Sequence, residues 1–160
     1  MSSMVRLLLF TLLTAGCALV LSPPSGPLVT VEAHGGRCLQ GECRTLVAIE
    51  ADGLVHQIEP VEAEIHRATD EAIDAYRAAL AVTDFDAIRA RPFTGECPTA
   101  FDGQELIYTF ATPAGPERIS SCEVDFDPHA PLFAAVNGML GADLRLDRPV
   151  PKNVILAGGT

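Results

Sequence analysis

The sequence predicts an α+β fold, a small two-layer domain in which an antiparallel sheet carries helices on one face. Two observations favour this class. Short runs of β-branched and aromatic residues occur in pairs around turn residues, which is typical of β-hairpins. Each set of strands is followed by a segment in which apolar residues recur at helical spacing. The predicted order is β-β-(β)-α-β-β-α, in which the bracketed strand is optional.

The first hairpin is centred on an Asp52-Gly53 turn. Residues 44–49 are rich in β-branched side chains, and residues 54–58 form a second apolar run. Two apolar runs around Asp-Gly are a strong signal for a hairpin. The optional strand is predicted over residues 61–66, because apolar and polar residues alternate there and give one wet face.

The clearest helix begins at Thr69 or Asp70, where a capping side chain and acidic residues favour a helix N-terminus. Thr83 and Asp86 match the capping-box pattern and predict a further short helix through Ile88. Five apolar residues of the first helix form one stripe at helical spacing. They are Ala72, Ile73, Tyr76, Ala79 and Leu80.

The second half of the chain repeats the order of hairpin and helix. Residues 106–110 alternate as a strand, and a turn rich in proline leads to a partner strand predicted over residues 118–126. The second helix is predicted to start at residues 127–128 or 130–131 and to end at Gly141. Its buried face is formed by Leu132, Phe133, Val136, Met139 and Leu140.

The amino-terminal segment has the layout of an export signal. Arg6 precedes the apolar run Leu7–Leu21, which is shorter than the about 20 residues that cross a bilayer. Residues 14–17, Thr-Ala-Gly-Cys, are similar to a lipoprotein cleavage box, so Cys17 is the candidate lipidation site. Ordinary cleavage, either near Cys17 or after residues 31–33, and a short uncleaved anchor are the alternatives.

Four segments follow from these patterns. Residues 1–16 are the predicted signal peptide, and residues 17–33 are a lipidated or flexible tether rich in proline and serine. A single α+β domain is predicted over residues 34–141. Residues 142–160 contain prolines and a Gly-Gly pair, which predict a loose C-terminal tail.

The formal net charge is −10, from 21 acidic and 11 basic residues. Such a chain repels nucleic acid and anionic lipid headgroups, so neither is expected as an electrostatic partner. A membrane contact is expected only through a lipid anchor on Cys17. The remaining chain is long enough for one domain with one modest core.

The other four cysteines predict a disulfide framework, because exported proteins fold in oxidising compartments. Four cysteines allow three pairings, of which Cys38–Cys43 and Cys97–Cys122 are favoured. The first pair encloses a short loop, and the second ties a loop to a later strand. A zinc site built from His34, Cys38, Cys43 and Cys97 is the alternative. The spacings typical of such sites are absent, so no metal or other cofactor is expected.

Residues 93–103 are predicted to be a long loop pinned by its cysteine, and this loop is the candidate binding site. Function concentrates on loops that are held by a rigid scaffold. The side chains expected to contact a partner are Phe93, Glu96, Phe101 and Asp102. The alternative is that both phenylalanines only fix the loop to the core.

No catalytic residue is predicted. The Ser120-Ser121 pair lacks the Gly-x-Ser-x-Gly pattern of hydrolases. Paired carboxylates at residues 62 and 64, 84 and 86, and 125 and 127 are interpreted as surface charge. The histidines lie outside any catalytic motif, and they are His34, His56, His66 and His129.

Spaced glycine and cysteine motifs lie at residues 35–38, 43–44, 93–98, 101–105 and 121–122. Through these motifs the sequence resembles, over residues 35–140, an uncharacterised family of exported bacterial proteins, a resemblance that implies no particular activity. The layout of hairpin, helix, hairpin and helix, with its Gly-Gly start, is also similar to emfourin-type inhibitors of metalloproteases.

These observations together predict an exported, membrane-tethered or secreted envelope protein that works by binding. The expected partner is an envelope protein or ligand whose identity the sequence does not give. A secreted protease inhibitor is the first alternative, and a hydrolytic enzyme is the second.

Overall fold

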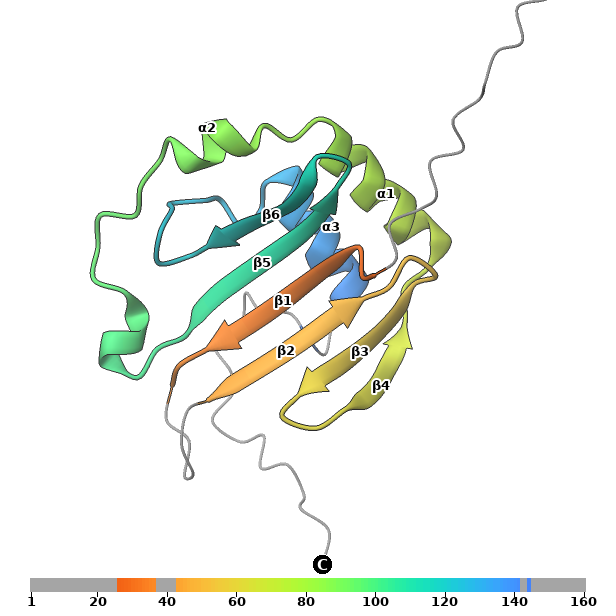
Figure 1. The fold of residues 1–160 in the computed structure, drawn as a ribbon, viewed down its shortest axis with the longest axis horizontal. Coiled ribbons are helices and arrows are strands. Elements are labelled where there is room, and N and C mark those ends of the chain that lie inside the picture. The colour runs from red at the N-terminus through yellow and green to blue at the C-terminus, as the bar shows by residue number, and fades with distance from the viewer. Residues whose placement is uncertain (1–25, 37–42, 142–143, 145–160) are drawn as a thin grey trace, which may run out of the picture.

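The computed structural model describes residues 26–36, 43–141 and 144 (Figure 1). They form a six-stranded antiparallel sheet with helices packed against it, which confirms the predicted α+β class. The strands are β1 (Val29–His34), β2 (Arg44–Ile49), β3 (Leu54–Glu59), β4 (Ala63–Arg67), β5 (Glu105–Thr112) and β6 (Gly115–Ser120). The helical segments are α1 (Asp70–Ala81), α2 (Phe85–Arg89), the 3-10 turn η1 (Pro98–Phe101) and α3 (Pro131–Leu140).

β1 lies at the centre of the sheet, whose order is β4-β3-β2-β1-β5-β6. It pairs antiparallel with β2 on one side and with β5 on the other. Val29, Val31 and Ala33 are buried, because alternate residues of a strand point to the same face. The predicted tether therefore extends too far. Residues 29–33 belong to a core strand, which cleavage after residue 33 would remove.

The predicted Asp52-Gly53 hairpin is confirmed and joins β2 to β3. Gly53 has a φ of +85°, a backbone conformation that glycine adopts without the strain of a side chain. The Asp52 carboxylate accepts a hydrogen bond from the Leu54 backbone N–H at 3.1 Å, which helps to close the turn. The local sequence therefore determines this hairpin.

β4 forms one edge of the sheet and fills the place of the optional strand. Its register against β3 contains an irregularity, and His66 is its half-buried residue. The ring nitrogen Nε2 of His66 lies 2.9 Å from the carbonyl oxygen of Met139 in α3. The apolar residues that predicted this strand, Val61 and Ile65, are instead 68% and 37% exposed.

The strand predicted over residues 118–126 both begins and ends earlier, since β6 covers Gly115–Ser120. Beyond it the chain turns, and the backbone N–H of Val124 donates to the Ser120 carbonyl at 3.1 Å. The alternation of apolar residues past Ser120 reflects burial within an irregular segment, not continued strand pairing.

Side-chain caps mark the starts of α1 and α2. Thr69 caps α1 as predicted, and its Oγ1 accepts a hydrogen bond from a backbone N–H of the first turn. α2 is capped by Asp84, whose carboxylate accepts from the Ala87 N–H at 2.9 Å, and not by Thr83. The Thr83 hydroxyl is engaged elsewhere, because it donates to the carbonyl of Ala79 at the end of α1.

The core lies between the sheet and the pair α1 and α3, which cover one face (Figure 1). α3 begins at the second of the two predicted starts, and its five predicted apolar residues are all buried. Phe133 stacks on Phe126 at a centroid distance of 4.3 Å and meets the ring of Tyr108 edge-on. The buried Tyr76 hydroxyl of α1 donates to the Leu28 carbonyl at 2.9 Å, and burial raises its pKa.

Within the described residues, no helix combines the length and the apolar character needed to cross a membrane. The predicted signal peptide and Cys17 lie outside the described residues, as does the predicted tail except for Leu144. The export and lipidation predictions therefore stay predictions.

Candidate functional site

The candidate binding loop connects α2 to β5, and its first residues run beside the segment that follows β6. Pro92 forms an isolated β-bridge with Val124. The backbone N–H of Phe93 donates to the Glu123 carbonyl at 2.9 Å, and the Asp125 N–H donates to the Arg91 carbonyl at 2.7 Å. These backbone hydrogen bonds hold the first residues of the loop against the segment that follows β6.

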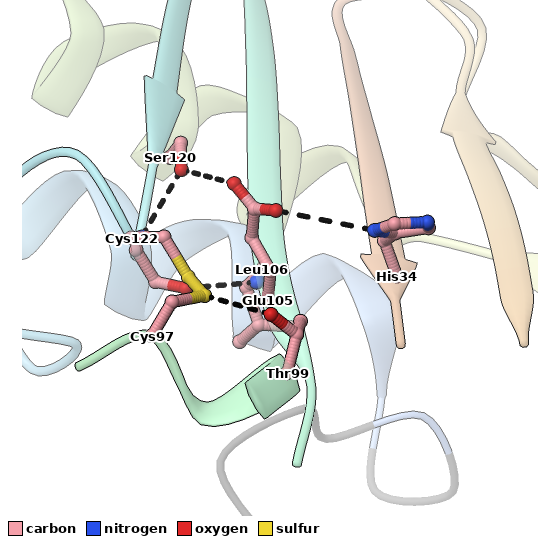
Figure 2. Close-up of a disulfide and its surroundings, with 8 residues drawn as sticks. His34, Cys97, Thr99, Glu105, Leu106, Ser120 and Cys122 are labelled. Atoms are coloured by element: carbon pink, nitrogen blue, oxygen red, sulfur yellow. Dashed lines mark hydrogen bonds and ion pairs between the residues drawn. A yellow bond between two sulfur atoms is a disulfide. The ribbon is translucent and has the colours of Figure 1, made fainter. Parts of the chain in front are cut away.

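A disulfide joins Cys97 in the middle of the loop to Cys122 beyond β6, the pairing that the sequence favoured (Figure 2). The neighbouring Ser121 exchanges two hydrogen bonds with Leu106 of β5. Its hydroxyl accepts from the Leu106 N–H, and its own N–H donates to the Leu106 carbonyl, both at 2.9 Å. The loop is thereby tied through Cys122 to β5, the strand next to the edge strand β6.

The tip of the loop is a single 3-10 turn, in a segment that the sequence predicted to be irregular. The N–H of Gly103 donates to the Pro98 carbonyl at 2.8 Å. A Cβ on Gly103 would lie 2.7 Å from that oxygen, so the turn closes this tightly only with glycine. Thr99 packs against the end of β1, where a Cβ on Gly35 would lie 2.7 Å from its Cγ2. The 3-10 turn at the tip of the loop is therefore packed against the end of β1.

The two phenylalanines of the predicted site have different environments. Phe93 is half-buried, and a Cβ on Gly95 would lie 2.7 Å from its Cζ, so the chain folds closely over this ring. Phe101 is 69% exposed, and Glu96 and Asp102 are exposed as well. The Phe93 ring is therefore partly covered by its own loop, whereas Phe101 is displayed to solvent.

An open groove of about 350 Å³ lies beside the loop, where Phe93 forms part of its wall. The lining is mostly apolar, with polar groups at its rim. Nothing in the sequence singled out this groove, because its residues come from separate segments of the chain. They are Phe93, Leu106, Ser121, Val124, Asp125, Phe126, Pro128 and His129.

A polar cluster lies directly beside the disulfide (Figure 2). The fully buried hydroxyl of Ser120 donates to the Glu105 carboxylate and accepts from the Cys122 N–H at 3.1 Å. The other carboxylate oxygen of Glu105 lies 4.0 Å from Nδ1 of His34 on the neighbouring strand. Here the carboxylate stands between serine and histidine, whereas a hydrolytic triad needs the imidazole to contact the serine. In the part of the chain that the structure describes, the Ser120 hydroxyl therefore contacts a carboxylate and a backbone N–H and no imidazole.

The other predicted non-catalytic histidines make structural contacts. Nε2 of His56 lies 3.0 Å from the Glu50 carboxylate, and His66 contacts the end of α3. The backbone N–H of His129 donates to the Asp127 carboxylate at 2.8 Å. Of the paired carboxylates, Asp84 caps α2 and Asp86 pairs with Arg89. These contacts lie within the described part of the domain, and the interpretation of the histidines and carboxylates as non-catalytic groups stays a prediction.

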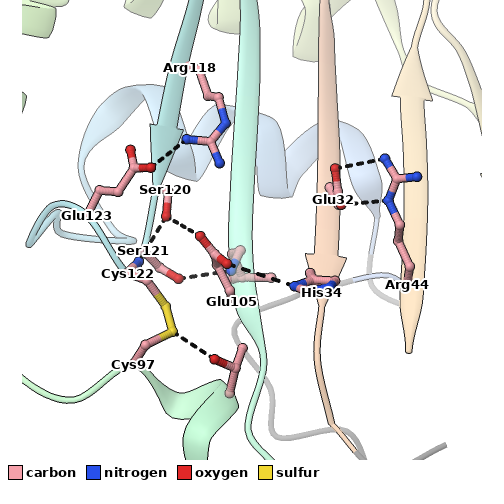
Figure 3. Close-up of polar contacts among 12 residues, drawn as sticks. Glu32, His34, Arg44, Cys97, Glu105, Arg118, Ser120, Ser121, Cys122 and Glu123 are labelled. Atoms are coloured by element: carbon pink, nitrogen blue, oxygen red, sulfur yellow. Dashed lines mark hydrogen bonds and ion pairs between the residues drawn. A yellow bond between two sulfur atoms is a disulfide. The ribbon is translucent and has the colours of Figure 1, made fainter. Parts of the chain in front are cut away.

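Charged residues also form a ladder across the sheet face that carries His34 and Glu105 (Figure 3). Arg44 of β2 contacts Glu32 of β1 at 2.6 Å and Glu59 of β3 at 2.8 Å. The guanidinium of Arg44 lowers the pKa of the Glu32 carboxyl. Sequence reasoning missed this ladder, because it depends on the register of three strands.

The alternative zinc site is not assembled in this structure. Cys97 is bonded to Cys122, and Cys43 is disulfide-bonded as well. Cys38 lies outside the described residues, so the favoured Cys38–Cys43 pair stays a prediction. Sequence reasoning also missed that Glu105 lies against the second disulfide, since no spacing signal links these residues.

No protein-family model matches this chain, and no curated protein or solved structure is significantly similar to it. The two resemblances drawn from the sequence therefore stay predictions. A functional assignment depends on the geometry of the loop and on the sequence alone.

Proposed function

We propose that the protein is an exported, non-enzymatic binding module that recognises an envelope protein through loop 93–103. The observation that carries the proposal is Phe101, a large apolar side chain that is 69% exposed on a loop closed by a disulfide. Isolated exposed apolar residues are common, so the exposure alone decides nothing. The support comes from the backbone around Phe101, which the disulfide at Cys97 holds on one side and the hydrogen bond of Gly103 to Pro98 holds on the other.

Preorganisation makes such a residue useful in binding. Ordering a flexible loop on association costs free energy, and a loop that is already fixed avoids most of that cost. Complete burial of a phenylalanine side chain contributes about 1.5–3 kcal/mol. Aromatic residues in the centre of an interface commonly dominate its energetics. Phe101 therefore has the properties of a central contact, with Glu96 and Asp102 at its margin.

Charge indicates the kind of partner surface that would fit. Between Pro92 and Pro116 the chain contains Glu96, Asp102 and Glu105 and no basic residue. A partner with an apolar pocket bordered by lysine or arginine would complement this segment. The binding rate should then fall as the ionic strength rises. Nucleic acid is disfavoured by the net charge of −10.

Export is supported by the amino-terminal sequence and by the use of cysteine. Disulfides persist in oxidising compartments, and Cys97–Cys122 is one. Lipidation of Cys17 would tether the domain to a membrane surface, whereas ordinary cleavage would release it. The mass of the protein purified from its native cells distinguishes these two forms.

A protease inhibitor is the second candidate, and one observation favours it. An aromatic side chain projects from a loop that is held by a disulfide and by tight packing at Gly35. Rigid, exposed loops of this kind can occupy a substrate cleft without large rearrangement. The candidate enzyme would be a protease with an apolar specificity pocket.

The test compares Phe101→Ser with Val61→Ser, which changes an equally exposed residue elsewhere. Envelope extracts are passed over each immobilised protein, and bound proteins are identified by mass spectrometry. The proposal predicts a defined partner retained by the wild type and by Val61→Ser and lost with Phe101→Ser. Equal retention by both variants would contradict it. Inhibition of subtilisin-type and chymotrypsin-type proteases, with the same variants, tests the second candidate.

A further inference from the structure

We propose that the reduced protein binds one zinc ion between Cys97, Cys122 and Glu105. Three potential ligand atoms, two sulfurs and one carboxylate oxygen, all lie within 4.8 Å of one another. They come from the binding loop, from the segment after β6 and from the first residue of β5 (Figure 2). All three residues are half-buried, so a metal ion held between them would be partly shielded from solvent.

The ligand set suits zinc. Thiolates and carboxylates are both common zinc ligands, at about 2.3 Å and about 2.0–2.2 Å respectively. Three protein ligands leave the fourth tetrahedral position for water or another ligand. Two thiolates and a carboxylate carry three negative charges, of which a divalent cation offsets two. This site differs from the one weighed on sequence grounds, because it uses Cys122 and Glu105 and not Cys38 and Cys43.

The chemistry is coupled to reduction of the disulfide. A dithiol reductant supplies two electrons and two protons, and it is itself oxidised to a disulfide as Cys97 and Cys122 become thiols. Zinc then replaces the two thiol protons, which pass to solvent. Because the metal binds only the reduced form, its presence shifts the thiol–disulfide equilibrium toward reduction.

The surroundings of Glu105 match those of a metal ligand. One of its oxygens accepts a hydrogen bond from the buried Ser120, and the other faces Nδ1 of His34 at 4.0 Å. Partners of this kind orient ligating carboxylates in metal sites. The Ser121–Leu106 hydrogen bonds hold the segment beside Cys122 independently of the disulfide (Figure 3). The backbone on this side of the site is therefore fixed before reduction.

The experiment uses the full chain with Cys17, Cys38 and Cys43 each replaced by serine, so that one cysteine pair remains. The protein is reduced with a phosphine, freed of reductant without oxygen, and titrated with Co²⁺ and then Zn²⁺. Thiolate-to-cobalt charge-transfer absorption reports coordination by sulfur, and native mass spectrometry counts the zinc ions. Near-ultraviolet circular dichroism follows the fold in parallel.

The reduced protein should bind one zinc ion, and the oxidised protein should bind none. Glu105→Gln should weaken binding by about tenfold or more, whereas Glu123→Gln, beside Cys122 but outside the cluster, should leave it unchanged. Equal zinc affinity in the wild type and in Glu105→Gln would overturn the proposal. That result would mean that the two cysteines alone bind the metal, as they would in an unfolded chain. Absence of binding by the reduced protein would overturn it as well.

This proposal is independent of the proposed binding function. Loss of Phe101 leaves every zinc ligand in place, so Phe101→Ser should bind zinc like the wild type. Failure of the zinc titration and failure of the partner experiment are therefore separate results.

Discussion

Two side chains near opposite edges of the sheet have almost the same exposure and very different settings. Val61, in the turn between β3 and β4, is 68% exposed, and Phe101, in η1, is 69% exposed. The turn at Val61 is held by a hydrogen bond from the Gln57 side chain to its carbonyl, at 3.0 Å. The segment at Phe101 is held by the disulfide, a closed 3-10 turn and packing against β1. Exposure alone therefore does not single out Phe101, and the proposal of a binding role for it depends on the contacts that hold its backbone.

The largest expected effect is on the free energy of unfolding, and it concerns the core beneath β5 and β6, the edge of the sheet beside the Cys97–Cys122 disulfide. Phe133 is 1% exposed and contacts the rings of both Phe126 and Tyr108. Phe133→Ala should lower the free energy of unfolding by about 3–5 kcal/mol, because it removes a buried aromatic ring and leaves a cavity. Denaturant titration measures this loss. A loss below about 1 kcal/mol would show that the aromatic cluster does not support this edge.

The second effect tests the rigidity of the loop itself. Replacing both Cys97 and Cys122 with serine opens a ring whose cysteines are 25 residues apart. The chain-entropy model gives a loss of roughly 3 kcal/mol for such a ring. Amides of residues 93–103 should exchange with solvent faster, and those of the β3–β4 turn should not. Equal acceleration in both regions would mean that the disulfide stabilises the whole domain and not the loop.

The third effect belongs to the opposite edge. His66→Ala removes the contact between β4 and the end of α3, which should cost about 1 kcal/mol. Hydrogen exchange should accelerate in β4 while the binding loop keeps its protection. Faster exchange in residues 93–103 would contradict the separation of the two edges.

The smallest effect concerns the charged ladder between the two edges. Arg44 lowers the folded-state pKa of Glu32, so the carboxylate stabilises the fold above its unfolded-state pKa. This stabilisation disappears as the pH falls through the lowered folded-state pKa. Glu32→Gln should cost up to about 1 kcal/mol at neutral pH. The difference from wild type should vanish in acid, and a difference that grows toward acid would reverse the assignment.

Local signals predicted the elements that depend on a few neighbouring residues. The turn at Gly53, the cap at Thr69 and the apolar face of α3 all follow from such signals. The central position of β1 was missed, because the alternation that starts at Val29 lies next to an apolar export signal and a proline-rich stretch. The early end of β6 was missed because burial in an irregular segment produces the same alternation as a strand.

The candidate site was predicted in part. The sequence placed a loop at residues 93–103, and among three possible pairings it favoured the one that contains Cys97–Cys122. The exposure of Phe101 emerges only from the structure, because the sequence left open that both phenylalanines fix the loop to the core. The cluster of Glu105, Ser120 and His34 depends on the register of β1, β5 and β6. Sequence spacing carries no information on that register, so the surroundings of the disulfide emerge only from the folded chain.

The central claim is that the chain contacts its partner through Phe101 and not merely through any exposed apolar residue. The most direct test places p-benzoylphenylalanine at position 101 or, as the matched control, at position 61, and irradiates cells that export the protein. We expect one defined cross-linked protein at position 101 and none at position 61. Cross-links of equal yield at both positions, or at position 61 alone, would contradict it.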